Sequence, residues 1–127
     1  FLRLPNVYLV DPNQEDIFDS LNRAKVLITA ASMTALDAML YEVPVLTIDL
    51  NEEVTYVDFI KQGATTHVDD KDQLNASIAM LYEAKNELGE KILEKQKSFF
   101  KASFETKKEG SAAFIGNYIA ERLKNAG

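Results

Sequence analysis

The chain has 127 residues, enough for one domain with a hydrophobic core, and its lack of cysteine excludes disulfides, cysteine-based zinc sites and a cysteine nucleophile. Its net charge of −6 is uneven, because residues 1–84 carry 14 acidic and 5 basic side chains whereas residues 85–127 carry 6 and 9. A nucleic-acid footprint needs a concentrated basic face, so we expect no nucleic-acid partner.

The first elements alternate between strand and helix patterns. Residues 7–10 (VYLV) predict a strand that ends at the turn Asp11-Pro12. A helix with Asn13 as its N-cap follows. Helical spacing predicts that its inner face holds Ile17, Leu21 and Ala24. Residues 26–28 form a continuously apolar run, which predicts a strand covered on both faces, as in a parallel sheet.

A second helix is predicted over residues 32–41. Its apolar residues are spaced i, i+3, i+7 and i+10 and are Met33, Leu36, Leu40 and Val43. Pro44 ends the helix, because the residue before a proline avoids the helical conformation. Residues 45–48 (VLTI) then predict the next buried strand.

The signals that follow are shorter. Residues 53–61 predict a short helix that Gly63 stops, and residues 64–68 predict a short strand. Asp69-Asp70 lies where a helix should begin. The inner face of that helix is marked by Leu74, Ile78 and Leu81.

Two further helices are predicted at the end of the chain. The first, continuous or interrupted, is marked by Leu88, Ile92, Phe99 and Phe104. The second begins at Gly110-Ser111, and its inner side is predicted to hold Phe114, Ile115, Tyr118, Ile119 and Leu123. Lysine and glutamate are interleaved through residues 87–109, which favours a solvated helix face; the alternative is a weak patch for a membrane surface or a protein partner.

The order β-α-β-α-β-α-β followed by helices predicts one α/β domain over residues 1–127, a Rossmann-like doubly wound parallel sheet with a helical C-terminal tail. The chain opens with Phe1 and enters an apolar run almost at once, so we expect a piece of a longer polypeptide. No apolar run approaches the roughly 20 residues that span a bilayer, and no secretory signal opens the chain. We therefore expect a cytoplasmic protein.

The loop over residues 29–34 (TAASMT) is the candidate ligand site. In open parallel sheets ligands bind beyond the carboxyl ends of the strands, and this loop offers three hydroxyls, small residues and a helix start that favours phosphate. Asp37 shares a helix face with Thr34, so its carboxylate is placed to accept hydrogen bonds from a ribose. The structural alternative makes Ser32 an N-cap, Thr34 a first-turn residue and Asp37 an exposed helix position. Neither G-x-G-x-x-G nor G-x-x-x-x-G-K-[ST] is present.

Several features follow one another after the second predicted strand: small residues, Ser-x-Thr-x-x-acid, and a helix that ends in Pro-Val before another strand. Together with that strand they resemble the donor-binding signature of GT-B fold proteins. This group includes bacterial surface-polysaccharide glycosyltransferases, enzymes like CDP-glycerol glycerophosphotransferase, and UDP-N-acetylglucosamine 2-epimerases. The matching residues are Ser32, Met33, Thr34, Asp37, Ala38, Leu40, Pro44 and Val45. Residues 16–26 resemble the approach to this strand in the family, and residues 109–113 (EGSAA) resemble the start of its closing helix.

The resemblance implies the C-terminal, donor-binding half of a glycosyltransferase, with Ser32 and Thr34 on the donor diphosphate and Asp37 on the ribose. Ala31 and Met33 flank these contacts. The family usually has Glu where this chain has Asp37, and many members have Gly or Ser where it has Met33. The implied ligand is a UDP- or CDP-linked sugar or polyol, with no cofactor and no metal. The catalytic base and the acceptor site belong to an N-terminal acceptor domain of the same protein, so the catalytic residues are unknown and this part alone is inactive.

His67, the single histidine, is a weak candidate for a general base, and a structural or exposed role is favoured. The acidic residues Asp69, Asp70 and Asp72 have two interpretations, a cation site or helix capping, of which capping is the commoner.

Three functional hypotheses therefore stand. The first is donor binding in a transferase, with peripheral association at the inner face of the plasma membrane as a further expectation for the full-length enzyme. The second is a 2-epimerase-like domain. The third is a non-catalytic module that binds a partner through Phe99, Phe100 and Phe104.

Overall fold

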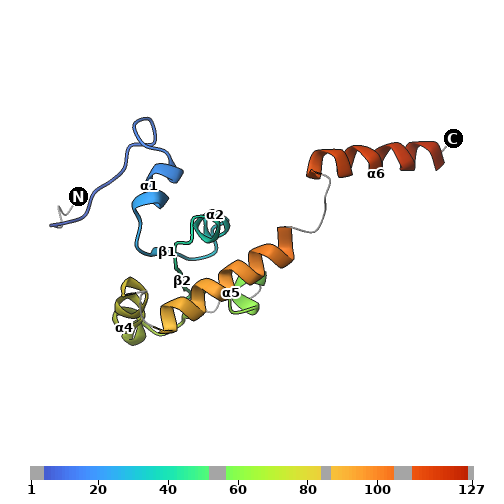
Figure 1. The fold of residues 1–127 in the computed structure, drawn as a ribbon. Coiled ribbons are helices and arrows are strands. Elements are labelled where there is room, and N and C mark those ends of the chain that lie inside the picture. Colours follow the sequence, from blue (N-terminus) through green and yellow to red (C-terminus); the bar gives the residue numbers. More distant parts are fainter. Residues whose placement is uncertain (1–4, 52–56, 84–86, 105–109, 126–127) are drawn as a thin grey trace.

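The chain folds as an α/β structure around a small parallel sheet (Figure 1). The computed structural model describes residues 5–51, 57–83, 87–104 and 110–125. Its three strands are β1 (Leu27–Thr29), β2 (Val45–Ile48) and β3 (Thr66–Val68), in the order β1-β2-β3 and all parallel. The strand over residues 45–48 is confirmed at both ends, because Pro44 and Asp49 bound a run that is apolar on both faces.

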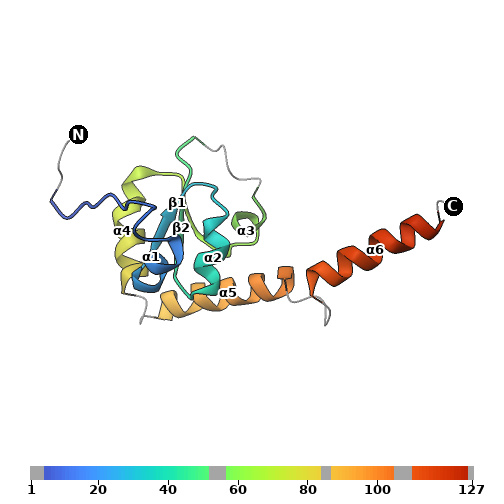
Figure 2. The ribbon, with the colours of Figure 1, turned by 90° about the horizontal axis from the view of Figure 1, so that it is seen from above.

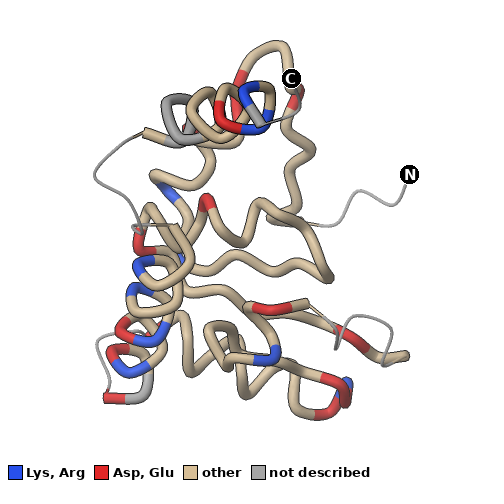
Figure 3. Tube along the Cα trace, turned by 90° about the vertical axis from the view of Figure 1, so that its right-hand side faces the viewer, with Lys and Arg blue, Asp and Glu red and all other residues tan. Residues whose placement is uncertain are grey.

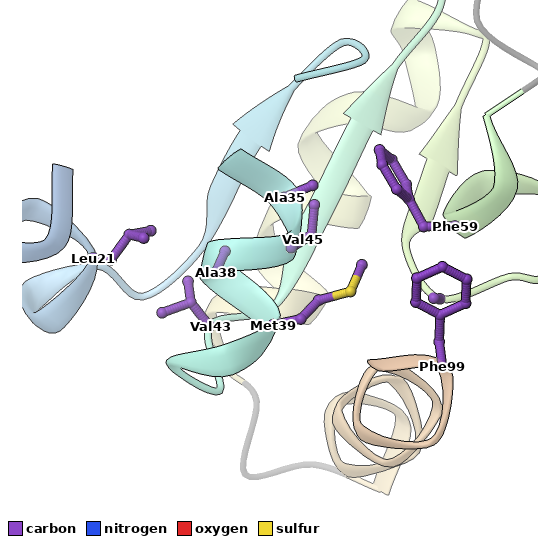
Figure 4. Packing of buried hydrophobic residues seen from close by; sticks show 9 residues of the cluster. Leu21, Ala35, Ala38, Met39, Val43, Val45, Phe59 and Phe99 are labelled. Atoms are coloured by element: carbon purple, nitrogen blue, oxygen red, sulfur yellow. The ribbon is translucent and has the colours of Figure 1, made fainter. Parts of the chain in front are cut away.

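Strand β2 is the centre of the sheet and separates two hydrophobic clusters. Val45 faces the first cluster and Leu46 faces the second, and both are fully buried. Helices α2 (Thr34–Leu40) and α3 (Asp58–Lys61) cover the Val45 face, whereas α4 (Lys71–Tyr82) covers the other face. Figure 4 shows the labelled residues of the first cluster around α2, α3 and α5, with Leu21 apart from the others on α1 (Ile17–Arg23).

Helix α5 (Glu87–Phe104) is continuous over its described length and runs along the amino ends of the strands (Figures 1 and 4). The carboxamide of Gln96, 1% exposed, joins it to the start of β2. Its Oε1 accepts a hydrogen bond from the Val45 N–H (2.9 Å), and its Nε2 donates to the Val43 carbonyl (3.0 Å). A single polar side chain therefore satisfies two buried backbone groups where no strand or helix supplies a partner.

The predicted strand over residues 7–10 is wrong. These residues lie outside any strand or helix, and Tyr8 is 84% exposed. β-branched and aromatic residues favour a strand only when a neighbouring strand is in place to bond with them, and β1 bonds with β2 on its other side. The sheet thus has three strands instead of the four that the sequence suggests, and Ile28 on its edge strand is exposed rather than covered.

Helix α1 (Ile17–Arg23) begins later than expected. Asp16, not Asn13, is its N-cap, and its carboxylate accepts a hydrogen bond from the Asp19 N–H (2.9 Å). Leu21 is buried as predicted, but Ile17 is exposed. The Glu15 carboxylate accepts hydrogen bonds from Arg23 and Ser20, which hold the pKa of Glu15 below its usual value.

Helix α2 is the shorter core of the predicted helix, and its inner face differs from the prediction. Its buried residues are Ala35, Ala38 and Met39, whereas Met33 and Leu40 are 65% and 61% exposed. Alanines at 0% exposure let the helix axis lie close to the sheet. Leu36 and Met39 pack beside them, whereas Met33 and Leu40 turn outward. Val43 is buried as predicted, after the helix has ended.

Gly63 ends the α3 segment, as predicted, in the left-handed region with φ 66°. No heavy atom lies within 4 Å of the position that a Cβ would take. Gly63→Ala should therefore destabilise the fold through backbone strain alone, by about 1 kcal/mol. Urea unfolding of both proteins measures this difference, and Gly116→Ala in a helix interior with equally open surroundings is the control, expected to be neutral or stabilising.

Of the remaining elements, α4 is as predicted, whereas α6 is as predicted in position but not in burial. Asp70 caps α4 by accepting a hydrogen bond from the Asp72 N–H (2.9 Å), and its inner residues Leu74, Ile78 and Leu81 join the second cluster. Helix α6 (Ser111–Asn125) forms where expected. It extends away from the sheet (Figure 2), and its described apolar residues are exposed rather than on an inner side.

Some expectations fall on parts that the structure leaves undescribed. Residues 53–56 of the predicted short helix and the side chains of Leu88 and Phe114 lie outside the described residues. Within the described ranges, no helix has both the length and the hydrophobicity that a membrane span requires.

Candidate functional site

The predicted ligand residues lie together where β1 leads into α2, at the carboxyl edge of the sheet. Thr29 ends β1, and Thr34 is the first residue of α2. Between them, Ala31 is half-buried whereas Ser32 and Met33 are exposed.

Ser32 and Thr34 are joined by two hydrogen bonds. The Ser32 hydroxyl donates to Thr34 Oγ1 (3.0 Å), and Ser32 Oγ accepts from the Thr34 backbone N–H (3.2 Å). The N-cap of α2 is Met33 and not Ser32, and Met33 makes no side-chain capping bond. The Ser32 side chain nevertheless satisfies the Thr34 amide at the start of the helix. Since Thr34 Oγ1 acts as the acceptor in its bond with Ser32, its own proton is left for another acceptor.

The first turn of α2 offers fewer amides than a free helix start. The Ala35 N–H donates to the Ser32 carbonyl (3.1 Å), and the Leu36 N–H donates to the Met33 carbonyl (2.9 Å). Asp37, one turn beyond Thr34, is half-buried on α2. An anion at this loop would therefore be bound mainly by hydroxyls and by the loop backbone before Thr34, and less by the helix amides.

A row of polar side chains crosses the sheet beside this loop, and the sequence did not predict it. Thr29, Thr47 and His67 are partners in register on the three strands. Thr47 Oγ1 lies 3.1 Å from His67 Nδ1 and 3.1 Å from Thr65 Oγ1. His67 therefore has a structural partner on β2, as favoured from the sequence. The signal that could have revealed the row is the threonine inside the apolar strand VLTI, on the same face as Val45.

The acidic turns at Asp11, Asp49 and Asp70 are occupied by local structure, and the first of them follows no strand. Asp11 Oδ1 accepts hydrogen bonds from the backbone (2.9 Å) and side chain (3.0 Å) of Asn13. Asp49 is buried, and its N–H donates to the Val68 carbonyl (2.9 Å). Asp70 caps α4, so capping accounts for one member of the acidic group at residues 69–72. Among the described residues, no three His, Cys, Asp or Glu side chains are grouped to hold a metal ion.

Comparison with known proteins places the chain in no family. No family model, curated protein or solved structure matches it. The fold and the arrangement of these side chains are therefore the observations that bear on function.

Two cavities in the described structure lie away from this loop. One of about 370 Å³ lies along α1, where Glu15 and Arg23 form an exposed ion pair. The other, of about 590 Å³, is lined mainly by α5, together with Met80 of α4 and Gln62 at the end of α3. Neither of these two cavities is lined by a residue of the loop over residues 29–34.

The aromatic residues of the partner-binding hypothesis are only partly accessible. Phe99 belongs to the first hydrophobic cluster and is 8% exposed, and Phe100 packs beside it. Phe104 is exposed and lies with its ring centroid 4.9 Å from that of Phe100. A partner could therefore meet Phe104, but Phe99 has a structural role.

Proposed function

We propose that this chain is the donor-binding part of a GT-B type transferase, with a Rossmann-like sheet that binds a nucleotide-activated sugar or polyol. The observation that carries the proposal is the Ser32–Thr34 pair at the carboxyl end of a parallel strand, one helical turn before Asp37. It matches the motif by which the sequence resembles this family. The parallel three-stranded sheet with helices on both faces is compatible with that fold.

The hydroxyl pair gives the loop a means to bind a diphosphate. Ser32 orients Thr34 Oγ1, so that the Thr34 proton can be donated to a phosphate oxygen. Charge-assisted hydrogen bonds of this kind are stronger than neutral ones. The Asp37 carboxylate, on the same side of α2, accepts from the ribose hydroxyls. This arrangement stabilises a leaving nucleoside diphosphate by fixed donors and needs no metal ion.

The rest of the reaction belongs to groups elsewhere. His67 bonds to Thr47 and is not assigned as the base. The base and the acceptor site are assigned to an N-terminal acceptor domain of the same protein, so this part binds donor without turnover. UDP- and CDP-linked donors are the expected ligands, and the full-length enzyme is expected in the cytoplasm or at the inner face of the plasma membrane.

Nucleotide titration tests the proposal. Adding UDP, CDP or GDP to labelled protein should shift the amide resonances of residues 31–37, with millimolar affinity. Thr34→Val and Asp37→Ala should each weaken binding roughly tenfold, since each removes a hydrogen bond to a charged or hydroxylated ligand group. Asp72→Ala, an exposed first-turn aspartate on α4, is the matched control and should leave affinity unchanged.

The outcomes separate the three hypotheses. If no nucleotide shifts these resonances at millimolar concentration, the donor site is wrong and the partner-binding module gains support. If nucleotide binds but Thr34→Val and Asp37→Ala bind as tightly as the parent, the chain binds nucleotide through another surface. A 2-epimerase-like domain would bind UDP-N-acetylglucosamine in preference to CDP-linked polyols.

A further inference from the structure

Helix α6 presents an apolar face to solvent. Its apolar residues recur at helical spacing, are between 50% and 69% exposed, and are Ile115, Tyr118, Ile119 and Leu123. The helix extends away from the sheet and from the other helices (Figures 1 and 2). An apolar face of this length on a helix is a surface that normally contacts a partner.

An apolar groove of about 590 Å³ lies along α5, the helix that precedes α6 in the chain. Its lining combines apolar, polar and charged residues and consists of Gln62, Met80, Lys91, Ile92, Glu94, Lys95, Ser98, Phe99 and Ala102. From Ile92 to Ala102 the groove follows α5 for about 15 Å, and the α6 face from Ile115 to Leu123 is about 12 Å long. The two surfaces therefore match in length and in apolar character.

Charge indicates which way α6 would lie in such a groove. Figure 3 shows basic and acidic residues interspersed along α5, whereas the charged residues of α6 all lie within residues 121–124. Arg122 lies over the Tyr118 ring, 5.4 Å from its centroid, and thus sits within the apolar face rather than opposite it. If α6 fills the groove, the Arg122 guanidinium enters it as well, and the groove must then offer a carboxylate as its partner. With α6 antiparallel to α5, Glu94 lies beside Arg122.

The same antiparallel alignment leaves Glu121 in solvent, because it projects from α6 about 100° away from Arg122. The alignment also brings Leu123 to Ile92 at the far end of the groove. A parallel alignment would place the last turn of α6, with Arg122 and Lys124, near Lys101 instead. The groove and the helix face are thus complementary in one orientation.

We propose that α6 of one chain fills the α4–α5 groove of a second copy, and that the second copy returns its own α6 to the first. In the structure α6 continues outward from the end of α5 instead of reversing onto its own groove (Figure 2). An element that is held away from its own binding surface can exchange with that of an identical chain, and a two-fold symmetric dimer fills both grooves.

The mass of the full chain in solution tests this proposal. Multi-angle light scattering over a range of concentrations should give a dimer. Ile119→Glu should convert it to a monomer, because the carboxylate would be buried in the groove. Asn117→Glu is the matched control, since it adds the same charge to the same helix about 160° away and should remain dimeric.

Charge reversal tests the orientation. Glu94→Arg and Arg122→Glu should each weaken the dimer at least tenfold, and the double variant should recover most of the loss. Both residues are exposed in the structure, so each variant should retain its circular dichroism spectrum and unfolding midpoint. Single variants as dimeric as the parent would overturn the Glu94–Arg122 pairing.

The absence of cysteine allows a direct decision between one chain and two. Glu94→Cys and Arg122→Cys on separate chains, mixed and oxidised, should give a covalent heterodimer. The doubly substituted chain should likewise crosslink between chains. A crosslink within a single chain of monomeric mass would overturn the exchange and place α6 on its own groove. A monomer that does not crosslink would overturn the use of this groove by α6 altogether.

Discussion

Gln96→Leu is expected to lower the free energy of unfolding by about 3 kcal/mol. The substitution removes both hydrogen bonds of the carboxamide and leaves the Val45 N–H and the Val43 carbonyl without partners in a buried position. Each such group costs about 1–3 kcal/mol, and the apolar surface gained by leucine offsets only part of this. Equilibrium unfolding in urea, followed by circular dichroism, measures the change.

Gln73→Leu is the matched control for this experiment. Gln73 lies on α4 and is exposed, so the same change of side chain there should alter stability by less than about 0.5 kcal/mol. If Gln96→Leu proved equally neutral, the two backbone groups must have other partners, and the contact between α5 and β2 would not depend on the carboxamide. A loss of about 3 kcal/mol would take a large share of the stability of a domain of this size.

The central strand and α4 were predictable because local sequence and burial agree there. A run of four apolar or β-branched residues between Pro44 and Asp49 fits a strand that is covered on both faces. Likewise, Asp70 before an amphipathic segment fits a capped helix, and the structure contains both features. In both segments the fold supplies the packing partners that the hydrophobic pattern requires.

The predictions that are wrong concern what lies next to a segment. Residues 7–10 have the composition of a strand, yet no strand of the described part of the chain lies beside them. In α2, periodicity of the large residues suggested Met33 and Leu40 as inner residues, but the alanines face the sheet. The sizes of the side chains do not determine how closely a helix axis approaches the sheet. Spacing alone therefore could not decide which face of α2 is buried.

The candidate site was predictable in position but not in its hydrogen bonds. That ligand residues gather after β1 follows from the general rule for parallel sheets. The bond between Ser32 and Thr34 depends on where α2 begins, and the Thr47–His67 contact depends on the register of β2 and β3. Both are consequences of tertiary structure, since His67 is twenty residues from its partner in the chain.

Leu46→Ala is expected to destabilise the chain by about 3 kcal/mol. Leu46 is 0% exposed on the central strand and packs in the second cluster with Val68 and Leu81. Truncation removes buried methyl groups and leaves a cavity between the sheet and α4, for which losses of roughly 2–5 kcal/mol are typical. Urea unfolding measures the loss, and Leu40→Ala, at a position 61% exposed on α2, should cost far less.

The location of Leu46 also separates stability from the candidate site. Its side chain points to the α4 face, whereas Thr47, its neighbour on β2, points to the opposite face and bonds to His67. Below its unfolding transition, Leu46→Ala should therefore keep the parent's amide shifts at residues 31–37 and its nucleotide affinity. A variant that lost both stability and affinity would show that the loop depends on packing on the far side of the sheet. In that case the two faces of β2 would be coupled, and the Thr29–Thr47–His67 row would be the connection to examine by double-mutant cycles.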